Sequence, residues 1–281
     1  MEFKIDHGYH IHSQLSSCSR DPEQTPDRIL QYAKENGLSR ICLTDHYWDS
    51  AVDGASQWYR PQDFDHIAKA MPLPQDEEVE FLFGCETDMD KLMTVGIPAA
   101  RFDEFDFIII PTTHLHMTGF TISNEDAESN ERRAQLWVER LDALLHKSLP
   151  FGKIGLAHLV CGLIKRESRE EYLNVLSLIP DAEMERLFTM AAELGCGIEL
   201  NQSDMSFGDD EADVVLRPFR IAKSCGCKFY LGSDAHHPTE FKKSKGVFER
   251  AVTLLDLKES DKFHIKSSLV NKVKEDLNEL N

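Results

Sequence analysis

The sequence predicts an α/β fold, a distorted seven-stranded (β/α)7 TIM-like barrel, from two recurring patterns. Short apolar runs begin near residues 3, 40, 79, 105, 153, 197 and 228, and helical patterns separate most of them. Alternating strands and helices are typical of parallel βα units. Each run also has a His, Asp or Glu at or just past its end. A closed barrel would gather these residues at one rim, whereas a doubly wound open sheet would gather mainly those near its switch point.

Helix signals follow the first two runs. Thr25, Pro26 and Asp27 have the order N-cap, N1 proline and acidic first turn, and Gly37 ends the predicted helix. Residues 47–80 predict a long loop with a short helix near 62–70. Loops of this length within a compact domain are often functional.

The second half of the chain repeats the pattern. The run at 105–110 is the strongest predicted strand, and an amphipathic helix near 134–144 follows it. Further helices are expected near 167–179, 181–194, 217–224, 246–256 and 265–279. We expect residues 1–281 to form a single barrel domain, with its core at about 1–245 and C-terminal helices at about 246–281.

Composition limits the possible partners. The formal net charge of −18 argues against general nucleic-acid binding and against anionic membranes, both of which favour basic patches. It leaves a small phosphorylated substrate possible, because bound cations reverse the local field. The N-terminus has no signal-peptide pattern, and seven cysteines, an odd number, favour reduced thiols in the cytoplasm. Oligomeric state is left open.

Histidines and acids at the predicted strand ends have the character of metal ligands. His10 and His12 stand two apart, so an extended backbone directs both imidazoles to one face. Asp45 and His46 follow the second run, and Glu86 ends the third. A carboxylate that ends an apolar strand needs a cation partner.

Taken in order, these motifs resemble the PHP family, the polymerase and histidinol phosphatase superfamily. The motifs are His10-x-His12, Thr44-Asp-His46, Gly84-Cys-Glu86, His114, His158 and Gly232-Ser-Asp-Ala-His236. The resemblance covers about residues 8–240 and implies a distorted seven-stranded barrel that binds two or three divalent metal ions.

The resemblance implies a ligand set for three metals. The first metal would be held by His10, His12, Glu86 and Asp234, and the second by the bridging Glu86 with His114 and His158. His46 and His236 would hold the third with a ligand from the first loop. The expected loop ligand is Cys18, the sixth residue after His12, and Asp21 is the alternative. These ligand types suit zinc, manganese or iron, and a thiolate would favour zinc.

The implied activity is that of a metal-dependent phosphoesterase acting on a small phosphomonoester, histidinol-phosphate-like or nucleotide-like. A metal-bridging hydroxide would attack phosphorus, with Glu86, Asp234 and His236 at the reaction centre. Asp45 is expected to support a ligand from outside the metal shell. Arg20, Lys165 and Arg166 are candidate phosphate anchors, because they follow strand ends.

Several alternatives remain open at this point. Gly8 stands where relatives have an acid, which leaves the support of His10 undefined. His116 competes with His114, Glu199 either closes a strand or acts at the rim, and His7 is expected at the surface. The alternative functions are an amidohydrolase-type hydrolase of a C–N or ester bond, and a non-catalytic metal-binding module.

Overall fold

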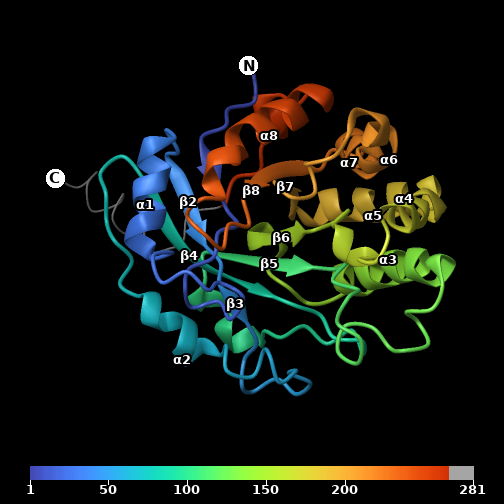
Figure 1. The fold of residues 1–281 in the computed structure, drawn as a ribbon, viewed down its shortest axis with the longest axis horizontal. Coiled ribbons are helices and arrows are strands. Elements are labelled where there is room, and N and C mark those ends of the chain that lie inside the picture. The colour runs from blue at the N-terminus through green and yellow to red at the C-terminus, as the bar shows by residue number, and fades with distance from the viewer. Residues whose placement is uncertain (266–281) are drawn as a thin grey trace.

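The strands of the protein form one parallel sheet that curls into a barrel (Figure 1). The computed structural model describes residues 1–265. Within them the strands are β1 (His7–Gly8), β2 (Arg40–Leu43), β3 (His46–Tyr47), β4 (Glu80–Thr87), β5 (Phe107–Pro111), β6 (Ile154–Ala157), β7 (Gly197–Asn201) and β8 (Lys228–Gly232).

Seven of these strands build the barrel wall in the order β1-β2-β4-β5-β6-β7-β8, and every pair is parallel. The two ends of this series meet just past β1 and β8. There Tyr9 N donates to Leu231 O at 2.8 Å, and His12 N donates to Ala235 O at 3.1 Å. The nearly closed seven-stranded barrel predicted from the sequence is therefore confirmed.

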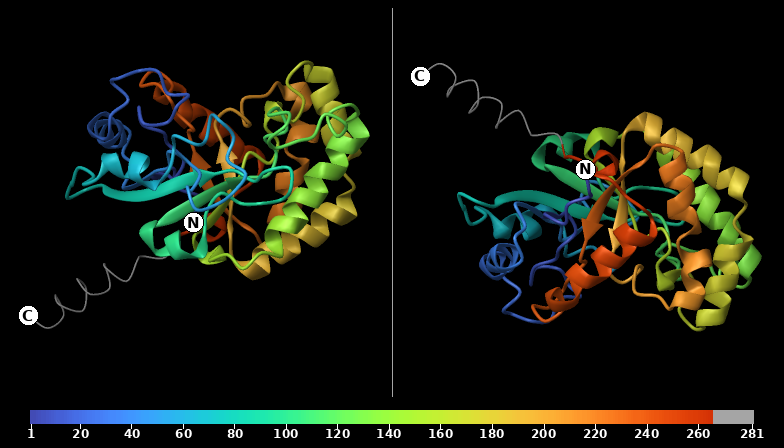
Figure 2. Two further views of the ribbon diagram at one scale, coloured as in Figure 1. Left: turned by 90° about the horizontal axis from the view of Figure 1, so that it is seen from below. Right: turned by 90° about the horizontal axis from the view of Figure 1, so that it is seen from above.

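Helices lie outside the strands, as Figure 2 shows from two directions. Their bounds are α1 (Pro26–Glu35), α2 (Phe64–Ile67), α3 (Asn130–Leu145), α4 (Arg169–Leu178), α5 (Asp181–Leu194), α6 (Ala212–Val215), α7 (Arg217–Ser224) and α8 (Phe241–Leu254). The predicted signals are confirmed: Thr25 caps α1, and Gly195 ends α5 at a φ of 78°.

Two apolar clusters reflect the alternation of side chains along the strands. Ile108 and Ile110 of β5 pack with helix residues in the larger cluster, which lies between strands and helices. Phe107 and Ile109 of the same strand belong to a smaller cluster, which also contains Tyr9 from just after β1. The smaller cluster fills the barrel interior, so the inward residues beyond it line the space at the C-terminal rim.

The structure corrects several local predictions. Residues 46–47 form an additional strand, β3, which pairs with β4. A short 3-10 helix at Ala99–Glu104, which was not predicted from the sequence, lies between β4 and β5. Helix α8 begins at Phe241, five residues before its predicted start. The predicted helix at 265–279 lies outside the described residues except for its first position.

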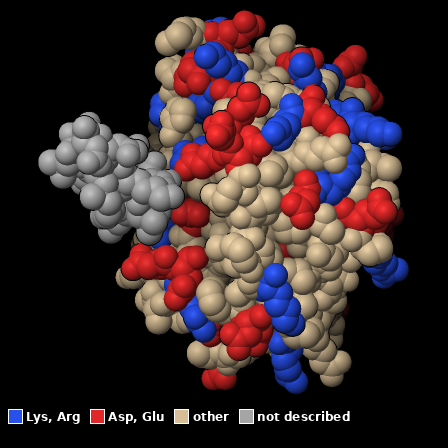
Figure 3. All heavy atoms as spheres, turned by 90° about the vertical axis from the view of Figure 1, so that its left-hand side faces the viewer, with Lys and Arg blue, Asp and Glu red and all other residues tan. Residues whose placement is uncertain are grey.

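His7 is not at the surface as predicted, because it is only 3% exposed. Its Nε2 accepts a hydrogen bond from Leu231 N at 3.2 Å, which ties β1 to β8. Within residues 1–265, no helix is long and apolar enough to cross a membrane. On the face drawn in Figure 3, acidic and basic side chains are interspersed, with no basic patch on that face.

Candidate metal centre

The predicted ligands converge at the C-terminal rim of the barrel. A cavity of about 470 Å³ opens there. Its lining includes His46, Glu86, His114, His158, Asp234 and His236, of which the last two follow β8 and each of the others comes from a different part of the strand series. His10 and His12 lie fully buried against the same cluster. The spatial gathering on which the sequence interpretation depends is therefore present in the fold.

The first implied ligand set is compact. The Nε2 atoms of His10 and His12 are 3.0 Å apart. Glu86 Oε2 lies 3.5 Å from His10 Nε2 and 3.3 Å from His12 Nε2. Asp234 Oδ1 lies 3.4 and 3.2 Å from the same two nitrogens. Four donor atoms thus surround one point.

The outer nitrogens of His10 and His12 determine how these rings face each other. His10 Nδ1 lies 2.6 Å from Glu199 Oε1, so this nitrogen donates to the carboxylate. Ser16 Oγ donates to Asp45 Oδ1 at 2.6 Å and lies 2.9 Å from His12 Nδ1, which must therefore donate to Ser16. In the neutral rings both Nε2 atoms then carry lone pairs that face each other across 3.0 Å, an arrangement that suits the binding of one cation by both rings.

Glu86 is the central carboxylate of the cluster. It is fully buried, and neither of its oxygens has a hydrogen-bond partner among the described residues. Burial alone would raise the pKa of Glu86, but His46 and His10 hold that pKa well below its usual range. An ionised, buried carboxylate whose oxygens accept no hydrogen bond, and which has only imidazoles as close partners, suits a bridge between two cations.

The second implied set lies beside the first. His158 Nε2 lies 3.6 Å from Glu86 Oε1 and 3.5 Å from Asp234 Oδ2. Burial opposes protonation of His158, yet the nearby acids Asp204 and Asp234 raise its pKa to about 10. Asp204 Oδ1 is 3.9 Å from His158 Nδ1, too far for a hydrogen bond, so we attribute its influence to charge.

His114 lies beside His158, in a donor group whose third member is Cys161 rather than the predicted Glu86. Its donor nitrogen lies within 4.8 Å of donor atoms of His158 and Cys161. His114 Nδ1 also pairs with Asp88 Oδ2 at 2.9 Å. His116 lines the cavity, but it belongs to none of the donor groups found among the described residues.

The third implied set lacks the ligand that was expected from the first loop. Donor nitrogens of His12, His46 and His236 lie within 4.8 Å of one another. Cys18 lines the cavity without joining this group. Asp21, the alternative, instead pairs with His237 at 2.6 Å. Burial and the neighbouring His12 lower the pKa of His236 to about 3, which keeps its ring neutral.

The sequence interpretation missed or undervalued the groups that support the histidines. Asp88, Cys161, Asp204 and Ser16 were not singled out, and Glu199 was left undecided. For Asp88 a signal existed, because Leu82, Gly84, Glu86 and Asp88 share one face of the strand pattern. No comparable pattern marks Ser16, whose role depends on Asp45 from another unit.

Gly232 is required by the pairing of His10 with Glu199. A Cβ atom at Gly232 would lie 1.9 Å from Glu199 Oε1 and 2.8 Å from His10 Cβ. Such contacts are far inside van der Waals range, and both neighbours are buried. The glycine of the Gly-Ser-Asp-Ala-His motif therefore makes room for this hydrogen bond.

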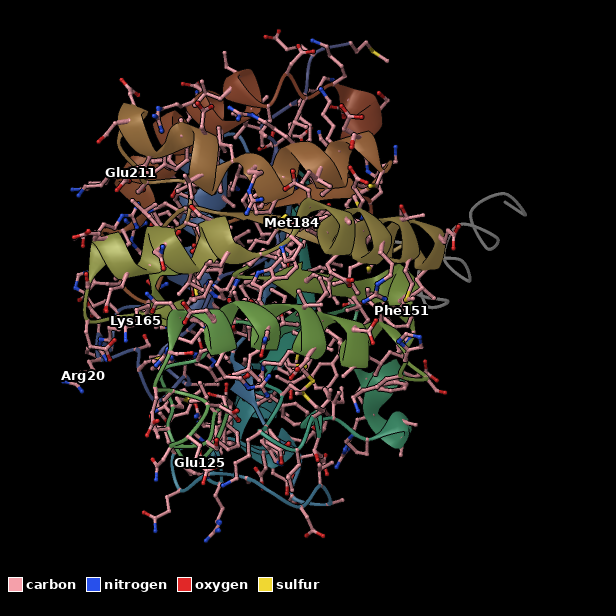
Figure 4. The ribbon with its side chains drawn as sticks, turned by 90° about the vertical axis from the view of Figure 1, so that its right-hand side faces the viewer. Arg20, Glu125, Phe151, Lys165, Met184 and Glu211 are labelled. Atoms are coloured by element: carbon pink, nitrogen blue, oxygen red, sulfur yellow. The ribbon has the colours of Figure 1, made fainter. Side chains whose placement is uncertain are left out.

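The predicted phosphate anchors lie outside the cavity wall. None of Arg20, Lys165 and Arg166 is among the described residues that line it. Arg20 and Arg166 are exposed, and Lys165 Nζ lies 3.5 Å from Glu171 Oε2. In the view of Figure 4, Arg20 and Lys165 lie on the same side of the molecule.

Known proteins resemble this chain over most of its length. Probable phosphatases from two strains of Vibrio vulnificus, YJ016 and CMCP6, are each 27% identical to it over 263 residues. Each comparison covers 91% of this chain and 85% of the relative.

A solved structure has the same fold. It is the histidinol phosphate phosphatase of Lactococcus lactis, in complex with zinc, L-histidinol and phosphate. Its TM-score is 0.53 at 18% identity, over 88% of this chain and 93% of that one. At this identity the likeness establishes the barrel fold. Residues 8–203 match the PHP domain family. The resemblance inferred from the ordered motifs is thereby confirmed, and the chain belongs to the PHP domain family.

Proposed function

We propose that this protein is a metal-dependent phosphatase that hydrolyses a small phosphomonoester. The observation that carries the proposal is the convergence of His10, His12, Glu86 and Asp234: the two imidazole Nε2 atoms lie 3.0 Å from each other and 3.2 to 3.5 Å from the carboxylate oxygens. The family and the phosphatase relatives support the same enzyme class.

The donor set fits divalent cations. Imidazole and carboxylate ligands suit zinc, manganese or iron, and we propose two or three ions held by the residues that the family resemblance implies. When bound, such ions lower the pKa of water and neutralise charge on phosphoryl oxygens. The lactococcal structure contains zinc, and the same metal is a candidate here.

The surrounding residues orient the site. Glu199 and Ser16 hold the two rings of the His10–His12 pair in the tautomers that direct both Nε2 atoms inward. Asp45 acts from outside the cluster, because its carboxylate binds Ser13 and Ser16 rather than an imidazole. We assign proton transfer to Asp234 or His236, which line the cavity. Arg20, Lys165 and Arg166 remain proposed anchors for the substrate phosphate at the rim, outside the residues that line the cavity.

The test is Asp234→Asn, with elemental analysis and phosphomonoester hydrolysis measured on the same samples. We expect loss of at least one metal equivalent per chain and a fall in kcat of about 100-fold or more, because a ligand carboxylate is removed. Asp103→Asn is the control, since that side chain is fully exposed. It should keep both metal and activity.

Two other functions predict different results. An amidohydrolase-type enzyme would hydrolyse dihydropyrimidines or aryl esters and leave phosphomonoesters intact. A non-catalytic module would show no turnover in either assay, and Asp234→Asn would then change binding alone. Both outcomes would refute the phosphatase proposal.

A further inference from the structure

The residues that line the cavity are of two chemical kinds. One is formed by the candidate metal ligands. The other includes Trp58, Met117 and Leu163, which lie in the loops that follow β3, β5 and β6. The reacting phosphoryl group belongs at the candidate ligands, so the rest of a substrate held in this cavity lies within reach of the apolar side chains.

Trp58 is held in place by its neighbours. Its ring lies 4.9 Å from the His46 ring at 70° and 4.7 Å from the Tyr59 ring at 88°. Tyr59 is 1% exposed and packs in an apolar cluster with Trp48 and Phe120, against which Met117 also packs. Trp58 itself is 38% exposed. The fold therefore anchors the loop and leaves an indole side chain at the cavity.

The cavity wall offers no partner for a second anion. Among the described residues that line it there is no lysine or arginine, while Glu86 and Asp234 are acids. An additional anionic group on a substrate would lose water without gaining a cation partner from the wall. An apolar ring would instead bury against Trp58, Met117 and Leu163, which is favourable.

We propose that the substrate is a phosphomonoester whose leaving group carries an apolar or aromatic ring and no second anionic group. This inference rests on the proposed phosphatase function and narrows its substrate class. Bisphosphates and ring carboxylates are poor substrates, and Trp58 is a specificity-determining residue.

Three matched esters test the proposal with the metal-loaded protein. Benzyl phosphate and ethyl phosphate differ in the ring, and 4-carboxybenzyl phosphate adds one negative charge to benzyl phosphate. We expect kcat/KM for benzyl phosphate to exceed each of the others by about tenfold or more, given the apolar area that the ring buries.

Substitutions then test which side chains produce the preference for the ring-bearing ester. Trp58→Ala should lower kcat/KM for benzyl phosphate about tenfold and change that for ethyl phosphate less than about twofold. Trp58→Phe should retain most of the preference. Leu178→Ala is the control, because Leu178 is 39% exposed but does not line the cavity. Leu163→Arg should raise turnover of 4-carboxybenzyl phosphate relative to benzyl phosphate.

Binding of benzylphosphonate and methylphosphonate, measured by calorimetry, gives a readout that does not depend on turnover. If none of the esters is hydrolysed, the phosphatase proposal fails, and tighter binding of benzylphosphonate would still support the cavity preference. The inference would be overturned if the two phosphonates bound with equal affinity or if the three esters had equal kcat/KM. It would also be overturned if Trp58→Ala lowered kcat/KM equally for all three esters. A preference for 4-carboxybenzyl phosphate over benzyl phosphate would also overturn the inference if Arg166→Ala abolished that preference.

Discussion

Three of the candidate ligand histidines have a polar side-chain partner at one ring nitrogen. His10 pairs with Glu199, His12 with Ser16 and His114 with Asp88. Such partners fix the tautomer and orientation of a ligating imidazole. The family resemblance predicts an acid at the position of Gly8, and in this fold Glu199 of β7 pairs with His10 instead.

Glu199→Gln tests this support at the residue scale. The amide still accepts from His10 Nδ1 but removes the negative charge, so metal affinity should fall about 10–100-fold. Affinity is measured by competition with a chelating dye. Glu193→Gln, an exposed change on α5, is the control. Unchanged affinity in Glu199→Gln would show that the contact does not tune the site.

At the scale of elements, β4 organises the rim. It is eight residues long, and its alternation places Gly84 and Glu86 on the inward face. Its pairing with the short strand β3 sets His46 directly beside Glu86. This register explains why His46 Nδ1 approaches Glu86 Oε2 to 2.9 Å, although 40 positions separate the two residues.

The closure between β1 and β8 should depend on pH through His7. Burial lowers the pKa of His7 below its ordinary value of 6.5, despite the opposing effect of Asp6. The unfolded chain therefore binds the proton more readily, and this contribution to stability is complete above pH 6.5 and is lost as the pH falls below it.

His7→Gln keeps an acceptor for Leu231 N but does not titrate. Below pH 6.5 the free energy of unfolding of the wild type should fall by up to about 1.4 kcal/mol per pH unit relative to the variant. Urea unfolding of both proteins between pH 5 and 8 measures this difference. Parallel pH profiles would contradict the prediction.

At the scale of the whole molecule, barrel closure is what brings the two ends of the motif series together. His10 O accepts from Asp234 N at 2.8 Å, across the seam between the segments that follow β1 and β8. The resulting cluster buries several acids within a chain of net charge −18. Self-repulsion in such a cluster opposes folding unless cations neutralise it.

Removal of the cations should therefore destabilise the whole fold. Ligands that bind only the native state at about 100 times their Kd contribute about 2.7 kcal/mol each. Treatment with a strong chelator should lower Tm by roughly 5–10 °C, and added zinc or manganese should restore it. Scanning calorimetry measures both steps. In Asp234→Asn the same treatment should produce a smaller shift, and an equal shift would argue that the ions act elsewhere.

The strand series, the helix caps and the ordered ligand candidates were all predictable from the sequence. Their signals are local: alternation within a strand, Thr25 before Pro26, and acids or histidines at strand ends. The family resemblance added the expected metal grouping, and the family is confirmed. Residue roles within the group stay predictions.

Only the tertiary structure decided which side chains meet. Glu199 reaches His10 across 189 positions, and Asp21 pairs with His237 rather than entering the cluster. Neither contact leaves a periodic trace, because each depends on the register of strands and the path of loops. The sequence by itself determined the barrel and the order of the candidate ligands, since these follow from short-range periodicity. Closure of the barrel decided the support of each ring and the apolar lining of the cavity, because both arise where distant loops meet.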